Sequence, residues 1–311
     1  MADIGCAGIL VADIFCGPIE KLPVPGELLA VEEIPSKAGG CAANVAIDLA
    51  KQGFDVDVCG CLGDDASAAV LMKSLASAGV DCTQVQRVDS HPTSKTVILL
   101  IEGEDRRYIH TFGANAAFNV RQISRQWIDG LKVFYLGGLC AMPGIVTSEL
   151  SELLRYCRQQ DIVTVVDVVV PKSYSGMDDL RSLMPHIDYF LPNEDEAWRL
   201  SGITNTQRQL EMFLELGVNT AIVTRGKDGV LAANADGCWQ AEVCPMDSID
   251  PSGSGDAFAA GIITGIMYDW EMPEMLRYAT VLGASATTAI GTTDGVFTAE
   301  DVRKFLDKNH K

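Results

Sequence analysis

The sequence predicts an α/β protein with a doubly wound, mostly parallel sheet in a three-layer arrangement. Along most of the 311 residues, runs of apolar and β-branched side chains alternate with helical patterns. This order is typical of repeated strand–helix–strand units. The strands are continuous apolar runs without regular polar alternation, so we expect helices to cover both faces of the sheet.

The predicted elements begin with a strand over residues 4–13 (IGCAGILVAD). A helix follows over residues 44–53, in which Val45 and Leu49 share one face and Gly53 is a typical C-cap. Further strands are expected at residues 55–63, 131–138, 161–170, 187–192 and 219–226, with helices between them.

Two segments interrupt this alternation. Residues 13–37 contain four prolines and little helical pattern, and residues 93–112 (TSKTVILLIEGEDRRYIHTF) predict two strands that form a hairpin around EGED. Together they predict a small β-sheet beside the main one, within a single α/β domain over residues 1–311. The alternative interpretation is that both segments are long surface loops.

The composition argues against several classes of protein. A formal net charge of −18 offers no clear basic face for nucleic acid. No run approaches the ~20 apolar residues of a membrane-spanning helix. The N-terminus carries Asp3 and no positively charged region, so it does not resemble a signal peptide, and we expect a cytoplasmic location. The ten cysteines include no C-x-x-C pair, which favours reduced, packed cysteines over a zinc site.

In open α/β sheets, ligands bind beyond the carboxyl ends of the strands, so the strand-to-helix turns are the places to look for a site. Four such turns are residues 39–44, 193–196, 224–229 and 250–256. Common motifs fail there. AIVTRGKD lacks the first glycine and the final Ser or Thr of a P-loop, and GSGDAF has Phe258 where a dinucleotide fingerprint needs glycine. Neither Ser252 nor Ser254 lies in the G-x-S-x-G motif of serine hydrolases.

The turn at residues 250–256 (DPSGSGD) has the chemistry of phosphoryl transfer. Glycines let the backbone approach a ligand closely, and the free N–H groups at the start of the following helix bind phosphate without a lysine. A carboxylate at the same place, Asp256, can accept a proton from an attacking hydroxyl group. The alternative is that Asp256 only caps the apolar helix that follows.

Four motifs together resemble the ribokinase family of carbohydrate kinases (the PfkB-type kinases), over essentially the whole chain. DPSGSGD resembles the family's D-T-x-G-A-G-D signature, with Pro251 in place of Thr and Ser254 in place of Ala. GGCAANVAIDLAKQG resembles its N-terminal signature, LPNEDEA its N-x-x-E element and VTRGKDG its T-x-G-x-x-G turn.

The resemblance implies a site with ATP, Mg²⁺ and a small sugar. Asp256 would activate the sugar hydroxyl, and the turn Gly253, Ser254 and Gly255 would form the anion hole for the γ-phosphate. The other residues are grouped by ligand: Asp13, Gly40 and Asn44 for the sugar; Asn193 for the phosphates and Glu196 for Mg²⁺ through water; Thr224 and Gly226 for the nucleotide; Asp250, Ser252 and Gly291 for a monovalent cation, usually potassium. Segments 13–37 and 93–112 would form a lid that pairs two subunits in a homodimer.

The residues themselves support some of these roles and leave alternatives open. Asn44 carries donor and acceptor groups that suit sugar hydroxyls, and the paired glycines before it leave room for a ring. Asn44 can equally be an ordinary helix-start residue and Asp13 a turn aspartate. Asn193 can be an Asx-turn residue and Glu196 a solvated one. Thr224 and Gly226 can be only a strand end and a turn.

The substrate is less well defined than the reaction. Many family members carry Lys after the paired glycines, whereas this chain has Cys41, and Arg106 or Arg107 on the predicted hairpin could restore a cation. We expect an unphosphorylated pentose or hexose, with a nucleoside or a sugar phosphate as alternatives. A sugar sensor without activity and a different nucleotide-dependent α/β enzyme are the alternatives from other classes.

Overall fold

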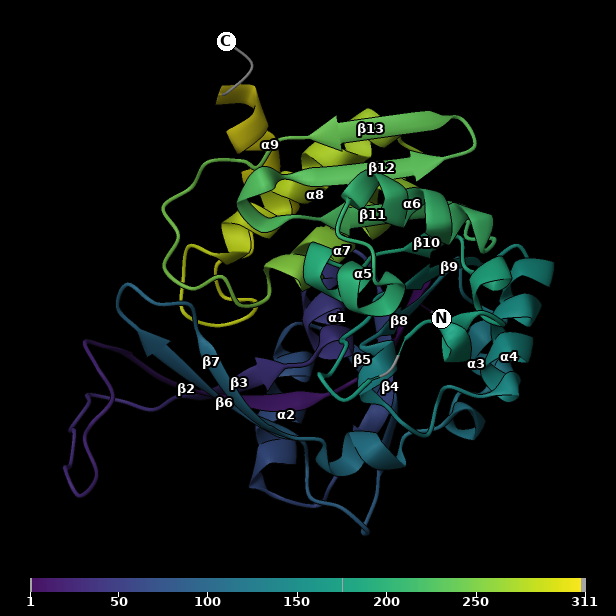
Figure 1. Cartoon of the computed structure of the whole chain (residues 1–311). Helices are drawn as coiled ribbons and strands as arrows, with labels where there is room; N and C mark the ends of the chain where they lie inside the picture. Colours follow the sequence, from purple (N-terminus) through teal and green to yellow (C-terminus); the bar gives the residue numbers. More distant parts are fainter. Residues whose placement is uncertain (1, 175, 309–311) are drawn as a thin grey trace.

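The computed structural model describes residues 2–174 and 176–308, which form two β-sheets and their surrounding helices (Figure 1). The larger sheet has nine strands in the order β13-β12-β11-β10-β9-β8-β1-β4-β5. Strand pairs from β5 to β11 are parallel, and β12 and β13 are antiparallel additions at one edge. The predicted doubly wound, mostly parallel sheet is therefore confirmed. Its strands are β1 (Ile4–Gly8), β4 (Val56–Leu62), β5 (Asp81–Arg87), β8 (Val133–Gly137), β9 (Val163–Val166), β10 (Tyr189–Phe190), β11 (Thr220–Thr224), β12 (Val230–Asn234) and β13 (Gly237–Ala241).

Helices lie on both faces of this sheet. Because parallel crossovers are right-handed, the connections that step from β1 towards β5 and those that step from β8 towards β11 lie on opposite faces. Helices α7 and α8 lie on the same face of the sheet as α1, because α1 packs on α7 and α7 packs on α8. The helices are α1 (Cys41–Lys51), α2 (Ala66–Ser77), α3 (Arg125–Ile128), α4 (Ser148–Gln159), α5 (Glu194–Ser201), α6 (Thr206–Glu215), α7 (Ser254–Met267), α8 (Met272–Ala286) and α9 (Ala299–Lys308). Short 3₁₀ turns are η1 (Gly113–Ala117), η2 (Val120–Gln122), η3 (Leu139–Ala141), η4 (Asp178–Leu180), η5 (Met184–His186) and η6 (Gly226–Asp228).

The smaller sheet is the lid that the interrupted segments predicted. Its strand order is β3-β2-β6-β7, with β2 and β6 parallel and the two outer pairs antiparallel. Figure 1 shows it projecting from the side of the larger sheet. Its strands are β2 (Val11–Ile19), β3 (Ser36–Gly39), β6 (Lys95–Ile101) and β7 (Arg107–Thr111).

The single strand predicted over residues 4–13 is wrong, because the chain changes sheets within it. Strand β1 ends at Gly8, whose φ of 142° suits glycine, and a Cβ there would collide with the carbonyl of Gly137. The Asn115 side chain then binds both backbone groups of Leu10, accepting from its N–H at 3.1 Å and donating to its carbonyl at 3.0 Å. The chain therefore passes directly from the main sheet into the lid.

Other boundaries also differ from the predicted ones. Strand β9 covers only Val163–Val166 of the predicted run 161–170, and the chain leaves the sheet at Asp167. The β12–β13 hairpin was not predicted, although Asn234 closes its turn by accepting hydrogen bonds from the N–H groups of Asp236 and Gly237. These departures occur where local side chains end or redirect a strand.

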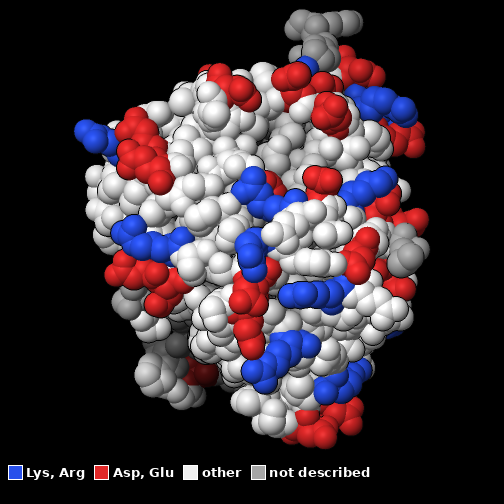
Figure 2. Space-filling model, turned by 90° about the vertical axis from the view of Figure 1, so that its right-hand side faces the viewer, with Lys and Arg blue, Asp and Glu red and all other residues white. Residues whose placement is uncertain are grey.

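The surface agrees with the acidic composition. On the face drawn in Figure 2, lysines and arginines are interspersed with acidic residues and form no continuous basic area. Across residues 2–174 and 176–308, the structure contains no helix with the length and apolar character needed to cross a membrane.

Candidate active site

The turn between Asp250 and Asp256 leads into helix α7 and gives the site its shape. Gly253 is the N-cap residue, with a left-handed φ of 79°. A Cβ there would overlap the backbone of Thr292, so the position requires glycine on two grounds. No side chain in the described part of the chain caps α7. Asp256 lies in the first turn of the helix and does not cap it, so the interpretation of this residue as a helix cap is wrong.

Asn44, at the start of helix α1, holds the Asp256 carboxylate. Its Nδ2 donates to Asp256 Oδ2 at 2.7 Å, and the Thr292 hydroxyl lies 2.8 Å from its Oδ1. The amide is thereby oriented with its donor towards Asp256. The packing of α1 on α7 brings together these two side chains, which are 212 positions apart.

Asp13 enters the same region from the lid strand β2. A Cβ at Gly39 would collide with the Asp13 carboxylate, and one at Gly40, whose φ is 88°, would lie 2.5 Å from the carbonyl oxygen of Ile9. The paired glycines are therefore needed to admit Asp13 and the backbone beside it, whether or not a sugar ring also uses the space.

Burial controls the charge of these carboxyl groups. Burial raises the pKa of Asp13 to about 7, with Asp256 and Asp250 adding repulsion and a hydrogen bond from Thr96 opposing it. Burial also raises the pKa of Asp256, against hydrogen bonds from Asn44 and Cys41 that lower it. A carboxylate held by donors in a poorly hydrated site is a suitable general base.

Two cavities meet at the turn. The inner cavity, about 240 Å³, is lined by Asp256 together with Cys41 and Glu196. The outer cavity, about 510 Å³, extends from the turn towards Gly226 on one side and helix α8 on the other. Both are lined by Arg106, Asn193, Thr224, Ser254 and Gly255. The glycine turn therefore lies where a long ligand in the outer cavity would reach the inner one.

Asn193 and Glu196 form a capping box at the start of α5. Asn193 Oδ1 accepts from the N–H of Glu196 at 2.9 Å, and Glu196 Oε2 accepts from the N–H of Asn193 at 3.0 Å. Both residues nevertheless line the inner cavity, and burial raises the pKa of Glu196 to about 7. Thr224 is joined to Asn193 by a parallel β-bridge, which explains why two separate motifs border the same space.

Asp250 links the turn to a second loop. Its two carboxylate oxygens accept from the N–H groups of Ser252, at 3.0 Å, and of Gly291, at 3.1 Å. Gly291 has a φ of 122°, which favours glycine. The structure thus brings together the three residues that the resemblance assigned to a monovalent cation.

Sequence reasoning missed Asp167, which follows strand β9 and lines the inner cavity. Its carboxylate accepts from the Tyr135 hydroxyl at 3.1 Å and from the N–H of Val168 at 2.7 Å. One ligand atom each of Asp167, Asp256 and Cys41 lies within 4.8 Å of the others. The available signal was the single aspartate in the middle of the apolar run TVVDVVV, at the carboxyl end of strand β9. Thr292 was also missed.

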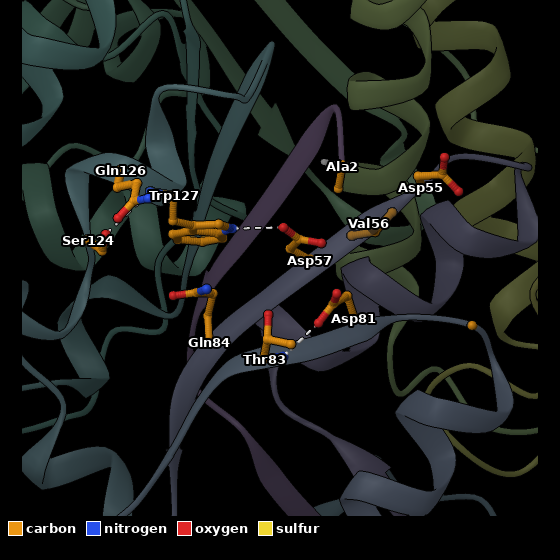
Figure 3. A pocket seen from close by; sticks show the side chains of 11 residues that line it. Ala2, Asp55, Val56, Asp57, Asp81, Thr83, Gln84, Ser124, Gln126 and Trp127 are labelled. Atoms are coloured by element: carbon orange, nitrogen blue, oxygen red, sulfur yellow. Dashed lines mark hydrogen bonds between the residues drawn. The ribbon is translucent and has the colours of Figure 1, made fainter.

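Another cavity, of about 630 Å³, lies at the amino ends of strands β4 and β5 and takes no part in this site (Figure 3). Asp57 and Asp81 line it together with Trp127, whose Nε1 donates to Asp57 Oδ2 at 3.0 Å. None of the residues singled out by the sequence motifs lines this cavity. Its size alone therefore does not make it the candidate active site.

A doubly wound sheet with a β lid, and a half-buried carboxylate beside a glycine turn at a helix N-terminus, define a protein of the ribokinase fold. The sequence model of the family described as "pfkB family carbohydrate kinase" matches residues 1–299. The chain therefore belongs to that family, whose members are phosphotransferases.

Relatives and solved structures agree with this assignment. The chain is 25% identical over 291 residues to a ribokinase from Haemophilus influenzae, covering 91% of this chain and 92% of that one. It is 26% identical over 286 residues to an aminoimidazole riboside kinase from Salmonella typhimurium, covering 87% and 88%. A putative ribokinase II from E. coli, solved with ATP and Mg²⁺, superimposes with a TM-score of 0.86 at 21% identity, covering 99% and 100%.

Proposed function

We propose that this protein transfers the γ-phosphoryl group of ATP to a hydroxyl of a small, unphosphorylated pentose or hexose. The observation that carries the proposal is the position of Asp256, which is held by Asn44 where the two cavities meet. ATP occupies the outer cavity with its γ-phosphate at the turn, and the sugar occupies the space bordered by Asp13, Gly40 and Asn44.

The chemical step follows from this arrangement. Asp256 accepts the proton of the sugar hydroxyl as its oxygen attacks the γ-phosphorus, and the bond from that phosphorus to the ADP oxygen breaks. The N–H groups of Gly253, Ser254 and Gly255 stabilise the negative charge on the transferred group. Glu196, through water, and Asp167 would hold Mg²⁺ with the hard oxygen ligands that it prefers, with Asn193 beside the phosphates. The ion would supply positive charge to the phosphates. Thr224 and Gly226 border the nucleotide.

Charge favours a neutral substrate over a phosphorylated one. The inner cavity is lined by three carboxyl groups, Asp167, Glu196 and Asp256, against one basic side chain from the lid, and position 41 supplies a thiol. The curated relatives named above are kinases of ribose and of an imidazole riboside, which keeps a nucleoside as the second candidate. A 6-phosphofructokinase, 22% identical, keeps a sugar phosphate as the third.

A substrate panel tests the proposal. Purified protein with ATP and Mg²⁺ is offered pentoses, hexoses, nucleosides and sugar phosphates, and ADP formation is measured by a coupled assay. We expect turnover on at least one unphosphorylated sugar, and higher turnover in potassium than in tetramethylammonium salts, because Asp250, Ser252 and Gly291 are the proposed cation site. Turnover on phosphorylated sugars alone would overturn the substrate class. Sugar binding without ADP formation anywhere on the panel would favour a sensor.

We also expect a homodimer that pairs through the lid. Leu28 and Ile109 in the lid segments are 86% and 65% exposed, which is unusual for large apolar side chains. Burial of these side chains against a second subunit would remove that apolar surface from water. Light scattering with size-exclusion chromatography measures the molar mass, and Ile109→Asp is expected to lower it to that of one chain. A monomeric wild-type protein would contradict this expectation.

A further inference from the structure

Two consecutive arginines, the last residue of the β6–β7 turn and the first residue of β7, lie in different surroundings. The Arg106 side chain is 24% exposed and lines both the inner and the outer cavity. The Arg107 side chain is 51% exposed and forms an ion pair with Glu104 at the surface. Only the first of the two therefore faces the ligand space.

The charges of the residues that line the inner cavity make Arg106 important there. Among the described residues that line it, Arg106 is the one basic side chain, and three others carry carboxyl groups. A phosphoryl group that passes from the outer cavity to the inner one must cross this junction. Without a basic side chain there, its negative charge would face carboxylates with only Mg²⁺ and backbone N–H donors to offset it.

The guanidinium group is held in place by its neighbours. Its Nη1 lies 3.2 Å from Asp105 Oδ1, its Nε donates to the Tyr108 hydroxyl, and its Cζ lies 5.6 Å from the centre of the Tyr108 ring. Burial raises the pKa of Tyr108, and the neighbouring Arg106 acts in the opposite direction. The contacts that hold the guanidinium therefore come from residues of its own hairpin.

We propose that Arg106 is a catalytic residue that binds the phosphoryl group in transfer, so that the lid supplies one of the groups that stabilise the transition state. The inference rests on the proposed function. The guanidinium donates hydrogen bonds to the phosphoryl oxygens as the new oxygen–phosphorus bond forms and the bond to ADP breaks. It neither gains nor loses a proton, since the hydroxyl proton goes to Asp256. The site is then complete only when the lid lies over the turn.

The test compares Arg106→Ala and Arg106→Lys with Arg107→Ala as the matched control on the same hairpin. With the sugar found by the panel, we expect Arg106→Ala to lower kcat on the order of 10²–10³-fold, with a smaller change in the KM for the sugar. Arg106→Lys should restore only part of the loss, because an ammonium group lacks the planar fork of donors. Arg107→Ala should stay within about 2-fold of the wild type, as expected for an exposed ion pair.

A binding measurement separates this role from a purely structural one. Calorimetry with Mg²⁺ should show that Arg106→Ala weakens a non-hydrolysable ATP analogue, with an imido group between the β- and γ-phosphates, by about 10-fold or more. The affinity for ADP should change much less. Equal losses for both nucleotides, or none, would overturn the proposal, as would unchanged kcat. This comparison needs no sugar, so it still tests Arg106 if the panel finds no substrate and the proposed function fails.

Discussion

Replacing Asp256 with asparagine is expected to lower kcat by at least ~10²-fold and to leave the fold and ATP binding intact. Asparagine has nearly the same shape, and its amide oxygen can still accept from Asn44 Nδ2, which donates at 2.7 Å in the wild type. The amide cannot accept the hydroxyl proton, however, so the chemical step is lost. Steady-state kinetics with the best sugar measures the effect, and unfolding temperature with nucleotide calorimetry provides the control. Near-normal turnover would contradict the role of Asp256.

The pH dependence provides a second readout of the same base. A general base works only when it is unprotonated, and burial raises the pKa of Asp256 above the ordinary range for aspartate. The acid-side loss of kcat/KM is therefore expected at a higher pH than for an exposed aspartate. Burial also raises the pKa values of Asp13 and Glu196 to about 7, so kcat/KM should fall as the pH decreases through that region. A kcat/KM that stays constant down to about pH 5 would contradict this assignment.

Replacing Gly253 with alanine is expected to remove measurable activity and to destabilise the protein. At a φ of 79° a side chain costs about 1–2 kcal/mol even in open space. Here the added Cβ would also overlap the backbone of Thr292, so either the turn or the 292 loop must shift. A shift of that kind would displace the donors that are proposed to receive the γ-phosphate.

Gly255→Ala is the matched control for the loss of stability only, because Gly255 itself lies in the proposed anion hole. Gly255 lies two residues further on, in the first turn of helix α7, and apart from its chain neighbours and the helix's own backbone no described atom lies within 4 Å of the Cβ that it would gain. Alanine there should leave the unfolding temperature unchanged or raise it slightly, because alanine favours helices by about 1 kcal/mol over glycine. If Gly253→Ala unfolds at the wild-type temperature and retains activity, the strained turn is not needed for the reaction.

Local patterns were enough to locate the centre of the site. Glycines beside Asp256, and paired glycines before Asn44, are short signals that need only a few neighbouring residues to be recognised. The hydrogen bond between Asn44 and Asp256 then depends on the packing of two helices, α1 and α7, which the sequence pattern did not predict.

Other features depended on contacts that no local pattern reveals. Thr292 is one of several polar residues in the loop GTTDG, and its importance comes from lying against Gly253 and Asn44. Asp167 was hidden because an apolar run on both sides of it resembles one long strand. The change of sheet after Gly8 was hidden for the same reason, since Ile9 and Leu10 are as apolar as the strands that they separate.

The connection from strand β1 to strand β2, near the proposed sugar site, is too short to absorb a change in chain length. Only Ile9 and Leu10 lie between the two strands, and Asp13 follows at the third position of β2. Because successive strand residues face opposite sides, one inserted or deleted residue here would turn Asp13 away from Gly39 and out of the pocket. The long loop between β2 and β3 carries no such constraint. Insertions and deletions are therefore tolerated in the β2–β3 loop at the far end of the lid. The number of residues from Gly8 to Asp13, in contrast, must stay constant to keep Asp13 in the pocket.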